Sequence, residues 1–363
     1  MKSYINFYES LSCAGNTKEL MDAIYNKKSA ITIDNTYILN TSVAIGKIKN
    51  YFFFKNLTNV ISTLLKKSNL EDFKNTLLLV GSSVGGMAES EQQYFKDKNY
   101  KNIDPSQHSI NAIAEYLKKD FSFLDVRSFS TACTSSANAL LVAKRLISVG
   151  AYKNILVLGA DALCYTTVCG FHALSVLSSK HCTPFNEQRE GMNVAEAIGA
   201  LLIQNHQIKD SIELVGVGAS SDAYHMTNPD PEAKGAIASM QNALNDAGLN
   251  TKDIDYINAH GTGTMANDKV EALAIEKLFD NVDVSSTKAI IGHTLGAAAA
   301  MEAIISCEVI KSQKIPPQTA LIQQENPNIS IPTKCLNKKI HYTVSNSFAF
   351  GGNNVTLIFG KVN

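Results

Sequence analysis

The sequence lacks the features that would place the protein on a membrane or on nucleic acid. Basic and acidic residues both number 33, so no excess charge favours nucleic acid or an anionic surface as a partner. The longest apolar stretch, residues 295–305, is too short to span a bilayer and carries Glu302. Residues 1–10 lack the apolar core of a signal peptide. We therefore expect a cytoplasmic protein that binds neither nucleic acid nor membranes.

The seven cysteines are not spaced as a metal site or a disulfide framework. None forms a close CxxC pair, and their number is odd. A chain of 363 residues, 45% of them apolar, can also bury a large core without covalent cross-links. We expect reduced thiols in an intracellular protein and no bound metal.

The chain also lacks a Pro/Gly/Ser-rich linker, yet its alternation of strands and helices begins twice. In the first part, apolar runs typical of strands buried on both faces lie at 75–81, 154–159 and 199–204, with helices predicted at 16–27, 57–67 and 105–119. In the second part, strands are predicted at 212–218, 255–260, 282–285, 339–345 and 354–359, and helices at 231–247, 268–279 and 295–311. Asp268 and Glu271 resemble a capping box. We predict two closely packed α/β halves, near 1–205 and 206–363.

One cysteine, Cys133, lies between two kinds of pattern in the stretch from Ser130 to Ser136. Residues 126–130 predict a strand, and residues 137–148 predict a helix that follows good N-cap residues. A thiol on such a turn is exposed and can attack a substrate. The positive end of the helix dipole is expected to lower the pKa of this thiol. Taken alone, a small buried cysteine beside a helix start is the more ordinary explanation.

Five further features lie at the ends of predicted elements, where catalytic residues of layered α/β proteins gather. They are the glycine-rich turn with His260, Thr262 and Thr264, then Lys288, His293, Glu302, and the loop FAFGG with Phe348 and Phe350. His293 precedes an apolar helix, where a neutral imidazole can donate to an oxyanion. Glu302 is the lone charge of that helix and needs a partner, for which Lys288 is a candidate.

Each feature also has an ordinary explanation, such as a loop histidine, a surface lysine or a hairpin with two core aromatics. Together they point to acyl transfer to a thiol. In this order the cysteine, the histidines, the lysine and the FAFGG loop resemble those of elongating β-ketoacyl-[acyl-carrier-protein] synthases. The likeness runs from end to end. Initiating synthases have an asparagine in place of His293, and thiolases have a second cysteine where this chain has FAFGG.

The resemblance implies a thiolase-like fold with two pseudo-duplicated halves in five layers, α-β-α-β-α. The first half would carry the nucleophile Cys133 and the second half both histidines. His260 and His293 would hold a malonyl thioester and promote its decarboxylation. Lys288 would support His293, with Glu302 behind it.

The resemblance also implies how the substrates are held. The backbone N–H groups of Cys133 and Phe350 would form an oxyanion hole, and Phe350 would gate the acyl pocket. Phe171 and Phe348 would line that pocket. Thr262 and Thr264 would contact a phosphopantetheine arm of acyl carrier protein, which carries the substrates, so that the enzyme needs no cofactor of its own.

The resemblance further implies a homodimer, or a heterodimer with a related subunit. Two alternatives belong to other classes: a non-catalytic, chain-length-determining partner subunit, and a thiolase-type degradative enzyme. The intact nucleophile and histidines argue against the first, and His293 and the FAFGG loop against the second.

Three departures from the family concern the substrate rather than the reaction. The chain is shorter than typical family members, and most of the missing length falls within residues 30–80. Relatives present basic residues to the carrier protein there, and Lys47, Lys49 and Lys55 are candidate substitutes. Residues 191–199 are less glycine-rich than in the family, although Glu196 keeps its place, and residues 352–354 differ slightly. Fatty-acid synthesis and a specialised polyene or polyketide-like pathway both stay open.

Overall fold

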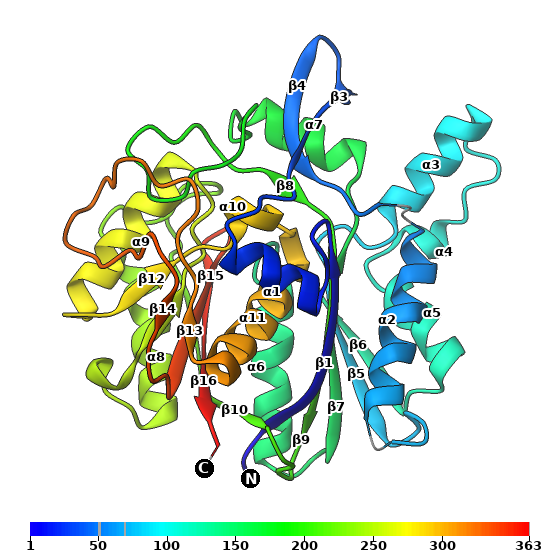
Figure 1. Ribbon diagram of the computed structural model, residues 1–363. Coiled ribbons are helices and arrows are strands. Elements are labelled where there is room, and N and C mark those ends of the chain that lie inside the picture. Colours follow the sequence, from blue (N-terminus) through cyan, green and yellow to red (C-terminus); the bar gives the residue numbers. More distant parts are fainter. Residues whose placement is uncertain (50–51, 69, 363) are drawn as a thin grey trace.

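The strands of the computed structural model, which describes residues 1–49, 52–68 and 70–362, follow one arrangement twice (Figure 1). The first half has the strand order β6 (Asp125–Phe129), β5 (Thr76–Gly81), β7 (Asn154–Asp161), β9 (Ala197–Gln204) and β1 (Tyr4–Ser12). The second half continues with β10 (Ile212–Ser221), β16 (Asn353–Lys361), β15 (Tyr342–Phe348), β11 (Tyr256–Asn258) and β12 (Asp283–Ser285).

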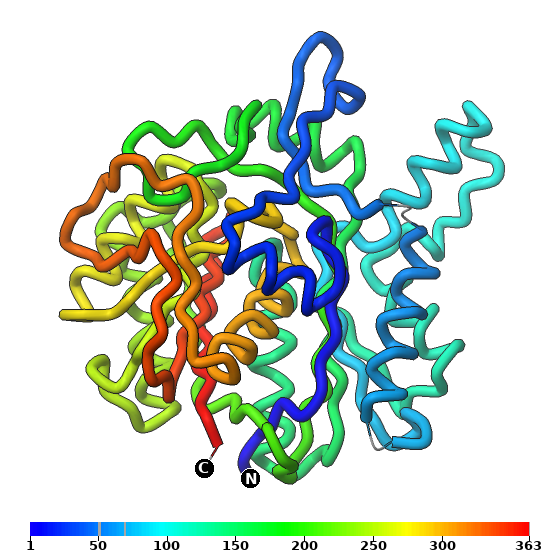
Figure 2. Tube along the Cα trace, viewed as in Figure 1, coloured from blue at the N-terminus to red at the C-terminus, as the bar shows by residue number. Residues whose placement is uncertain are grey.

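The pairing repeats as well as the order. Starting from β1, two antiparallel pairs are followed by two parallel pairs, and the same sequence of pairs starts again from β10. The halves join where β1 pairs with β10 through Tyr4–Glu213 and Ile5–Ile212. Since β10 also pairs with β16, both ends of the chain come together (Figure 2). The predicted pseudo-duplication is therefore confirmed.

Helices fill the space between the two halves of the sheet and cover both outer faces (Figure 1). The central layer consists of α6 (Ser135–Ser148) and α11 (Ala298–Ser312). The outer layers contain α2 (Phe53–Lys67) and α5 (Ala112–Phe121) on one side, and α8 (Lys234–Ala247) and α9 (Met265–Leu278) on the other. The five layers expected for a thiolase-like fold are present.

Continuous apolar strands follow from this layering. Leu77 and Leu79 of β5 face the core around the central helices, whereas Leu78 and Val80 face the outer core. Because successive side chains of a strand point to opposite faces, a strand buried on both faces must be apolar throughout. Helix α11 is buried nearly all round for the same reason.

The remaining elements are short or peripheral. They are β2 (Gly15–Asn16), α1 (Thr17–Tyr25), β3 (Thr32–Ile38), β4 (Thr41–Gly46), α3 (Met87–Asp97), α4 (Pro105–His108), α7 (Tyr165–Ala173), β8 (Val194–Ala195), α10 (Lys288–Ile291), β13 (Lys314–Ile315), β14 (Leu336–Asn337), and two 3-10 turns, Thr251–Asp253 and Leu295–Ala297. The helix predicted at 105–119 is two helices. The β3–β4 hairpin, α3 and α7 were not expected. In the part of the chain that is described, no helix combines the length and apolarity needed to cross a bilayer.

The central helices approach the sheet so closely that Gly159 of β7 has no room for a side chain. An added Cβ would lie 2.7 Å from Ala300 Cβ and 3.0 Å from Ser136 Cβ. We expect Gly159→Val to lower the free energy of unfolding by about 1–3 kcal/mol through overpacking. Urea unfolding measures this, with Gly170→Ala as the matched control, because a Cβ at Gly170 meets no atom of the described residues within 4 Å. Equal stabilities of the two variants would contradict the close packing.

Candidate active site

Cys133 lies on a tight turn between β6 and α6, as the sequence predicts. The turn is closed by the backbone oxygen of Ala132, which accepts from Ser83 Oγ at 3.0 Å and from Ser135 Oγ at 2.6 Å. Ala132 itself has a φ of 52°, a conformation that non-glycine residues adopt at a cost. The predicted strand, turn and helix are confirmed. Thr134 occupies the N-cap position, but its hydroxyl bonds to Thr131 and Asn353 instead of capping the helix.

The expected lowering of the Cys133 pKa is wrong for this structure. Burial raises the pKa of the thiol to about 11, because a thiolate loses its hydration there. The charge of Lys288 and the backbone N–H groups of Phe350 and Cys133 lower this pKa, but they do not offset the burial. The resting side chain of Cys133 is therefore a thiol. Both N–H groups that reach its sulfur are those predicted for the oxyanion hole.

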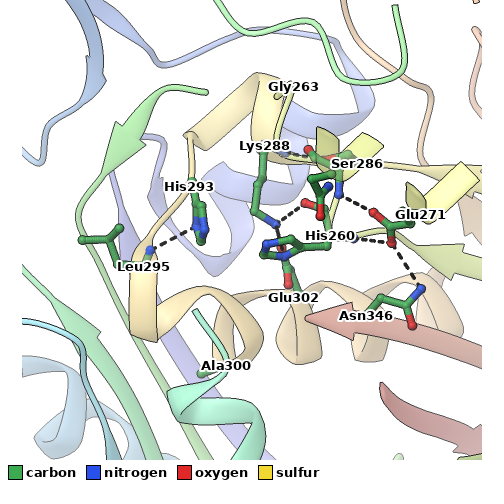
Figure 3. A network of polar contacts seen from close by, with 12 residues as sticks. His260, Gly263, Glu271, Ser286, Lys288, His293, Leu295, Ala300, Glu302 and Asn346 are labelled. Atoms are coloured by element: carbon green, nitrogen blue, oxygen red, sulfur yellow. Dashed lines mark hydrogen bonds and ion pairs between the residues drawn. The ribbon is translucent and has the colours of Figure 1, made fainter. Parts of the chain in front are cut away.

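Three reactive side chains converge from different parts of the chain. One ligand atom each of Cys133, His260 and His293 lies within 4.8 Å of the others, and all three residues are buried. The histidine rings are 5.1 Å apart and nearly perpendicular (Figure 3). His260 follows β11, and His293 lies between α10 and the turn that leads into α11. The structure thus brings together the three residues predicted to carry the chemistry.

Hydrogen bonds assign the tautomers of both histidines. The backbone N–H of Leu295 donates to His293 Nδ1 at 3.2 Å, so the proton of that ring is on Nε2. His293 Nε2 is buried and makes no hydrogen bond to a described residue. His260 Nδ1 faces the ammonium of Lys288 at 3.5 Å, which assigns its proton to Nε2 as well. Each ring therefore has an Nε2–H available for a ligand.

Both imidazoles are neutral at ordinary pH. Burial is the main cause that lowers the pKa of His260 and of His293 well below the usual value, and the nearby positive charge of Lys288 lowers both further. A neutral imidazole donates a hydrogen bond without being a strong acid.

Lys288 is buried and forms an ion pair with Glu302, as predicted (Figure 3). It also donates to the backbone oxygen of His260 at 2.6 Å. Its hydrogen bonds therefore support His260, whereas the resemblance implied that Lys288 supports His293 and the local field. The effect of Lys288 on His293 is that of its charge.

Asp268 and Glu271 are buried and hold the glycine-rich turn that begins at His260. The sequence placed both acids in a capping box. Thr264 is the N-cap of α9, so Asp268 and Glu271 lie inside the helix. Glu271 accepts from the backbone N–H groups of His260 and Gly261, each at 2.8 Å. Burial raises its pKa to about 7. The capping-box interpretation is wrong, because both side chains point back to the glycine-rich turn rather than to the helix end.

Asp161, at the end of β7, was missed by the sequence analysis. Its buried carboxylate accepts from Ser82 Oγ at 2.5 Å, from the N–H groups of Ser83 and Val84 at 2.9 and 3.0 Å, and from Gly296 N–H at 2.6 Å. Gly296 is three residues beyond His293, so Asp161 ties the two halves together behind the site. The sequence signal that could have indicated Asp161 is its position as the single acid at the end of an apolar strand.

Two cavities meet at Cys133. One, of about 400 Å³, is lined by both histidines, Thr262, Thr264 and Phe348. The other, of about 320 Å³, extends along α7 and is lined by Val84, Gly170 and Leu295. Cys133, Phe171 and Phe350 line both, and the two phenylalanine rings are 6.1 Å apart. Every predicted site residue lines one of these cavities except Lys288 and Glu302, which lie behind the histidines.

Comparison with known proteins agrees with this geometry. Residues 55–208 match the model of the N-terminal domain of β-ketoacyl synthases, and residues 212–321 match that of the C-terminal domain. A 3-oxoacyl-[acyl-carrier-protein] synthase 2 of Rhizobium meliloti (strain 1021) is 34% identical over 325 residues, which cover 82% of this chain and 76% of the relative.

Solved structures extend the likeness to the whole chain. A ketosynthase (ApeO) in complex with its chain length factor (ApeC), from Xenorhabdus doucetiae, superposes with a TM-score of 0.91 at 29% identity, covering 99% of this chain and 98% of the other. The complex AntDE:AntF, a type II polyketide acyl-carrier protein with its ketosynthase, gives a TM-score of 0.89 at 23% identity and covers 99% of both chains.

The raised pKa of Cys133 predicts how the thiol reacts with iodoacetamide. Because the thiolate is the reactive form, the alkylation rate of Cys133 is expected to rise about tenfold per pH unit from about pH 6 to about pH 9 without levelling off. Peptide mapping after timed alkylation measures this rate. The matched control is the same residue in urea-unfolded protein, where the rate levels off near about pH 8.5. A plateau at or below that pH in the folded protein would show that the helix dipole outweighs burial.

Proposed function

The chain belongs to the β-ketoacyl synthase family and is a 3-oxoacyl-[acyl-carrier-protein] synthase, and we propose that Cys133, His260 and His293 divide its two half-reactions between them. The observation that carries this proposal is the convergence of one thiol and two imidazole nitrogens within 4.8 Å on a shared cavity. Both imidazoles present an Nε2–H, so the site offers one nucleophile and two neutral hydrogen-bond donors.

In the first half-reaction, Cys133 Sγ attacks the thioester of an acyl chain on the carrier. The bond from sulfur to the acyl carbon forms and the bond from the acyl carbon to the carrier's sulfur breaks. The proton of the Cys133 thiol passes to the departing carrier thiolate. The N–H groups of Cys133 and Phe350 stabilise the negative oxygen that develops, because both already reach the cysteine sulfur. A protonated thiol at rest protects the nucleophile until a chain arrives.

In the second half-reaction, His260 and His293 donate from Nε2 to the carbonyl oxygen of a malonyl thioester. The bond between the malonyl carbon and its carboxylate breaks, and carbon dioxide leaves. The electron pair of that bond stays on the remaining thioester as an enolate. Neutral donors stabilise this enolate without protonating it. Its carbon attacks the acyl carbon on Cys133, a carbon–carbon bond forms, and the released thiolate takes up one proton. Loss of carbon dioxide makes the condensation irreversible.

The partner we propose for both half-reactions is an acyl carrier protein. Thr262 and Thr264 line the larger cavity with hydroxyls 2.9 Å apart, a polar path suited to the amides of a phosphopantetheine arm. Lys47, Lys49 and Lys55 are exposed and suit an acidic carrier surface. The solved complex of a polyketide carrier protein with its ketosynthase supports this partner.

We also propose a dimer, with either a second copy or a related subunit. Strand β6, which leads to Cys133, ends the sheet and pairs within the chain on one side, with β5. An edge strand is a template for pairing with another chain. The ketosynthase in complex with its chain length factor supports the related subunit as one form. The role of a non-catalytic subunit is disfavoured for this chain, because its nucleophile and both donors are in place.

The first half-reaction is tested with acyl carrier protein loaded with a panel of acyl chains. We expect intact-mass spectrometry to show one added acyl group per chain, located at Cys133, and none on Cys133→Ala. The chain length that reacts fastest then reports the capacity of the acyl cavity. If no acyl chain of the panel gives an acyl-enzyme, while malonyl carrier is still decarboxylated, the condensing role is contradicted.

The second half-reaction is tested with His293→Ala. We expect release of carbon dioxide from malonyl carrier to fall by about 10²–10³-fold, since one fixed donor to the enolate oxygen is lost, while acylation of Cys133 is largely retained. His108→Ala, an exposed histidine of α4, is the matched control. Loss of acylation with decarboxylation intact would reverse the assignment.

A further inference from the structure

Asn353, the first residue of β16, connects the two halves of the chain directly beside the nucleophile. Its Oδ1 lies 2.7 Å from Thr134 Oγ1 and accepts from Asn138 Nδ2 at 3.0 Å. Thr134 follows Cys133 in the chain, and Asn138 lies one turn further along α6. A side chain of the second half therefore holds the start of the nucleophile's helix.

The backbone of Asn353 holds the loop that carries Phe350. The N–H of Ala349 donates to the oxygen of Asn353 at 2.9 Å, and the N–H of Gly352 donates to the oxygen of Ala349 at 3.0 Å. Gly351 and Gly352 both have a positive φ, which permits this reversal of the chain. Asn353 is thus bonded on one side to the neighbour of Cys133 and on the other to the neighbour of Phe350.

We propose that Asn353 is a positioning residue that sets the separation between the two oxyanion donors, the N–H groups of Cys133 and Phe350. This inference rests on the function proposed above. An oxyanion hole works only while its donors lie within about 2.7–3.1 Å of the developing charge. Here one donor belongs to the first half of the chain and the other to the second. Another bond of the loop, from Gly351 N–H to Met226 O, stays within the second half and cannot set that separation.

The contacts of Asn353 can be removed without leaving its partners unpaired. The hydroxyl of Thr134 also lies 2.7 Å from the backbone oxygen of Thr131, and Asn138 Nδ2 also donates to Thr131 Oγ1 at 2.9 Å. Asn353→Ala is therefore expected to fold with little loss of stability. Thermal melting checks this before any rate is compared.

Single-turnover measurements on Asn353→Ala separate the two half-reactions. We expect acylation of Cys133 to slow about tenfold in its maximal rate, with the half-saturating carrier concentration unchanged, because misplaced donors weaken transition-state stabilisation alone. Decarboxylation of malonyl carrier is expected to stay within about twofold, since the histidines stabilise the enolate. Asn242→Ala, which removes one exposed amide bond to the backbone oxygen of Ala219, is the matched control.

Thr134→Val identifies the bond responsible. It is expected to slow acylation, and combining it with Asn353→Ala is expected to add little, because both variants remove the contact between Thr134 and Asn353. Wild-type rates in Asn353→Ala, equal losses in both half-reactions, or full additivity in the double variant would each overturn the positioning role. Failure of the unaltered protein to form an acyl-enzyme would instead overturn the proposed function.

Discussion

The buried ion pair between Lys288 and Glu302 is the interaction on which the electrostatics of the site depend. Removing two charges from water costs several kcal/mol for each, so such a pair is poor evidence of stability. Its value lies in where the ammonium is held. From one position Lys288 bonds to the backbone of His260, faces its Nδ1, and lowers the pKa of both histidines and of Cys133. Glu302 can remain in the apolar helix α11 because Lys288 pairs with it.

The duplication of the fold explains why the reactive groups meet. The helices α6 and α11 occupy equivalent places in the two halves. Cys133 comes shortly before α6, and His293 precedes the short turn, Leu295–Ala297, that leads into α11. His260 follows β11, the strand equivalent to β5, after which Ser83 supports the nucleophile turn. Phe350 follows β15, the equivalent of β7. The same ends of equivalent strands therefore face each other, and one repeated arrangement places Cys133 from the first half beside His260, His293 and Phe350 from the second.

Much of this architecture could be predicted from the sequence, because strands buried on both faces and apolar helices leave strong patterns. The β3–β4 hairpin was missed because β3 is largely exposed and has no apolar alternation. The capping-box interpretation was wrong because the spacing of two acids along the chain cannot show that Asp268 and Glu271 point back to the preceding turn. Asp161 binds chiefly backbone N–H groups, which leave no trace in the sequence. The Cys133 pKa was misjudged because the helix dipole is a local feature, whereas burial depends on both halves.

In the proposed mechanism, the placement of one positive charge beside two histidines serves both half-reactions. If the imidazoles were protonated, they would be acids strong enough to quench the enolate that they stabilise. Burial, together with the charge of Lys288, lowers the pKa of both rings and keeps them neutral. In the proposed mechanism each Nε2–H therefore stabilises negative charge without transferring its proton. The same ammonium favours the thiolate that Cys133 becomes during acylation and again when the product leaves. Glu302 pairs with this ammonium, although burial raises the pKa of the Glu302 carboxyl to about 7. In the proposed mechanism, one fixed positive charge therefore favours both the enolate and the thiolate, although the two anions form at different stages.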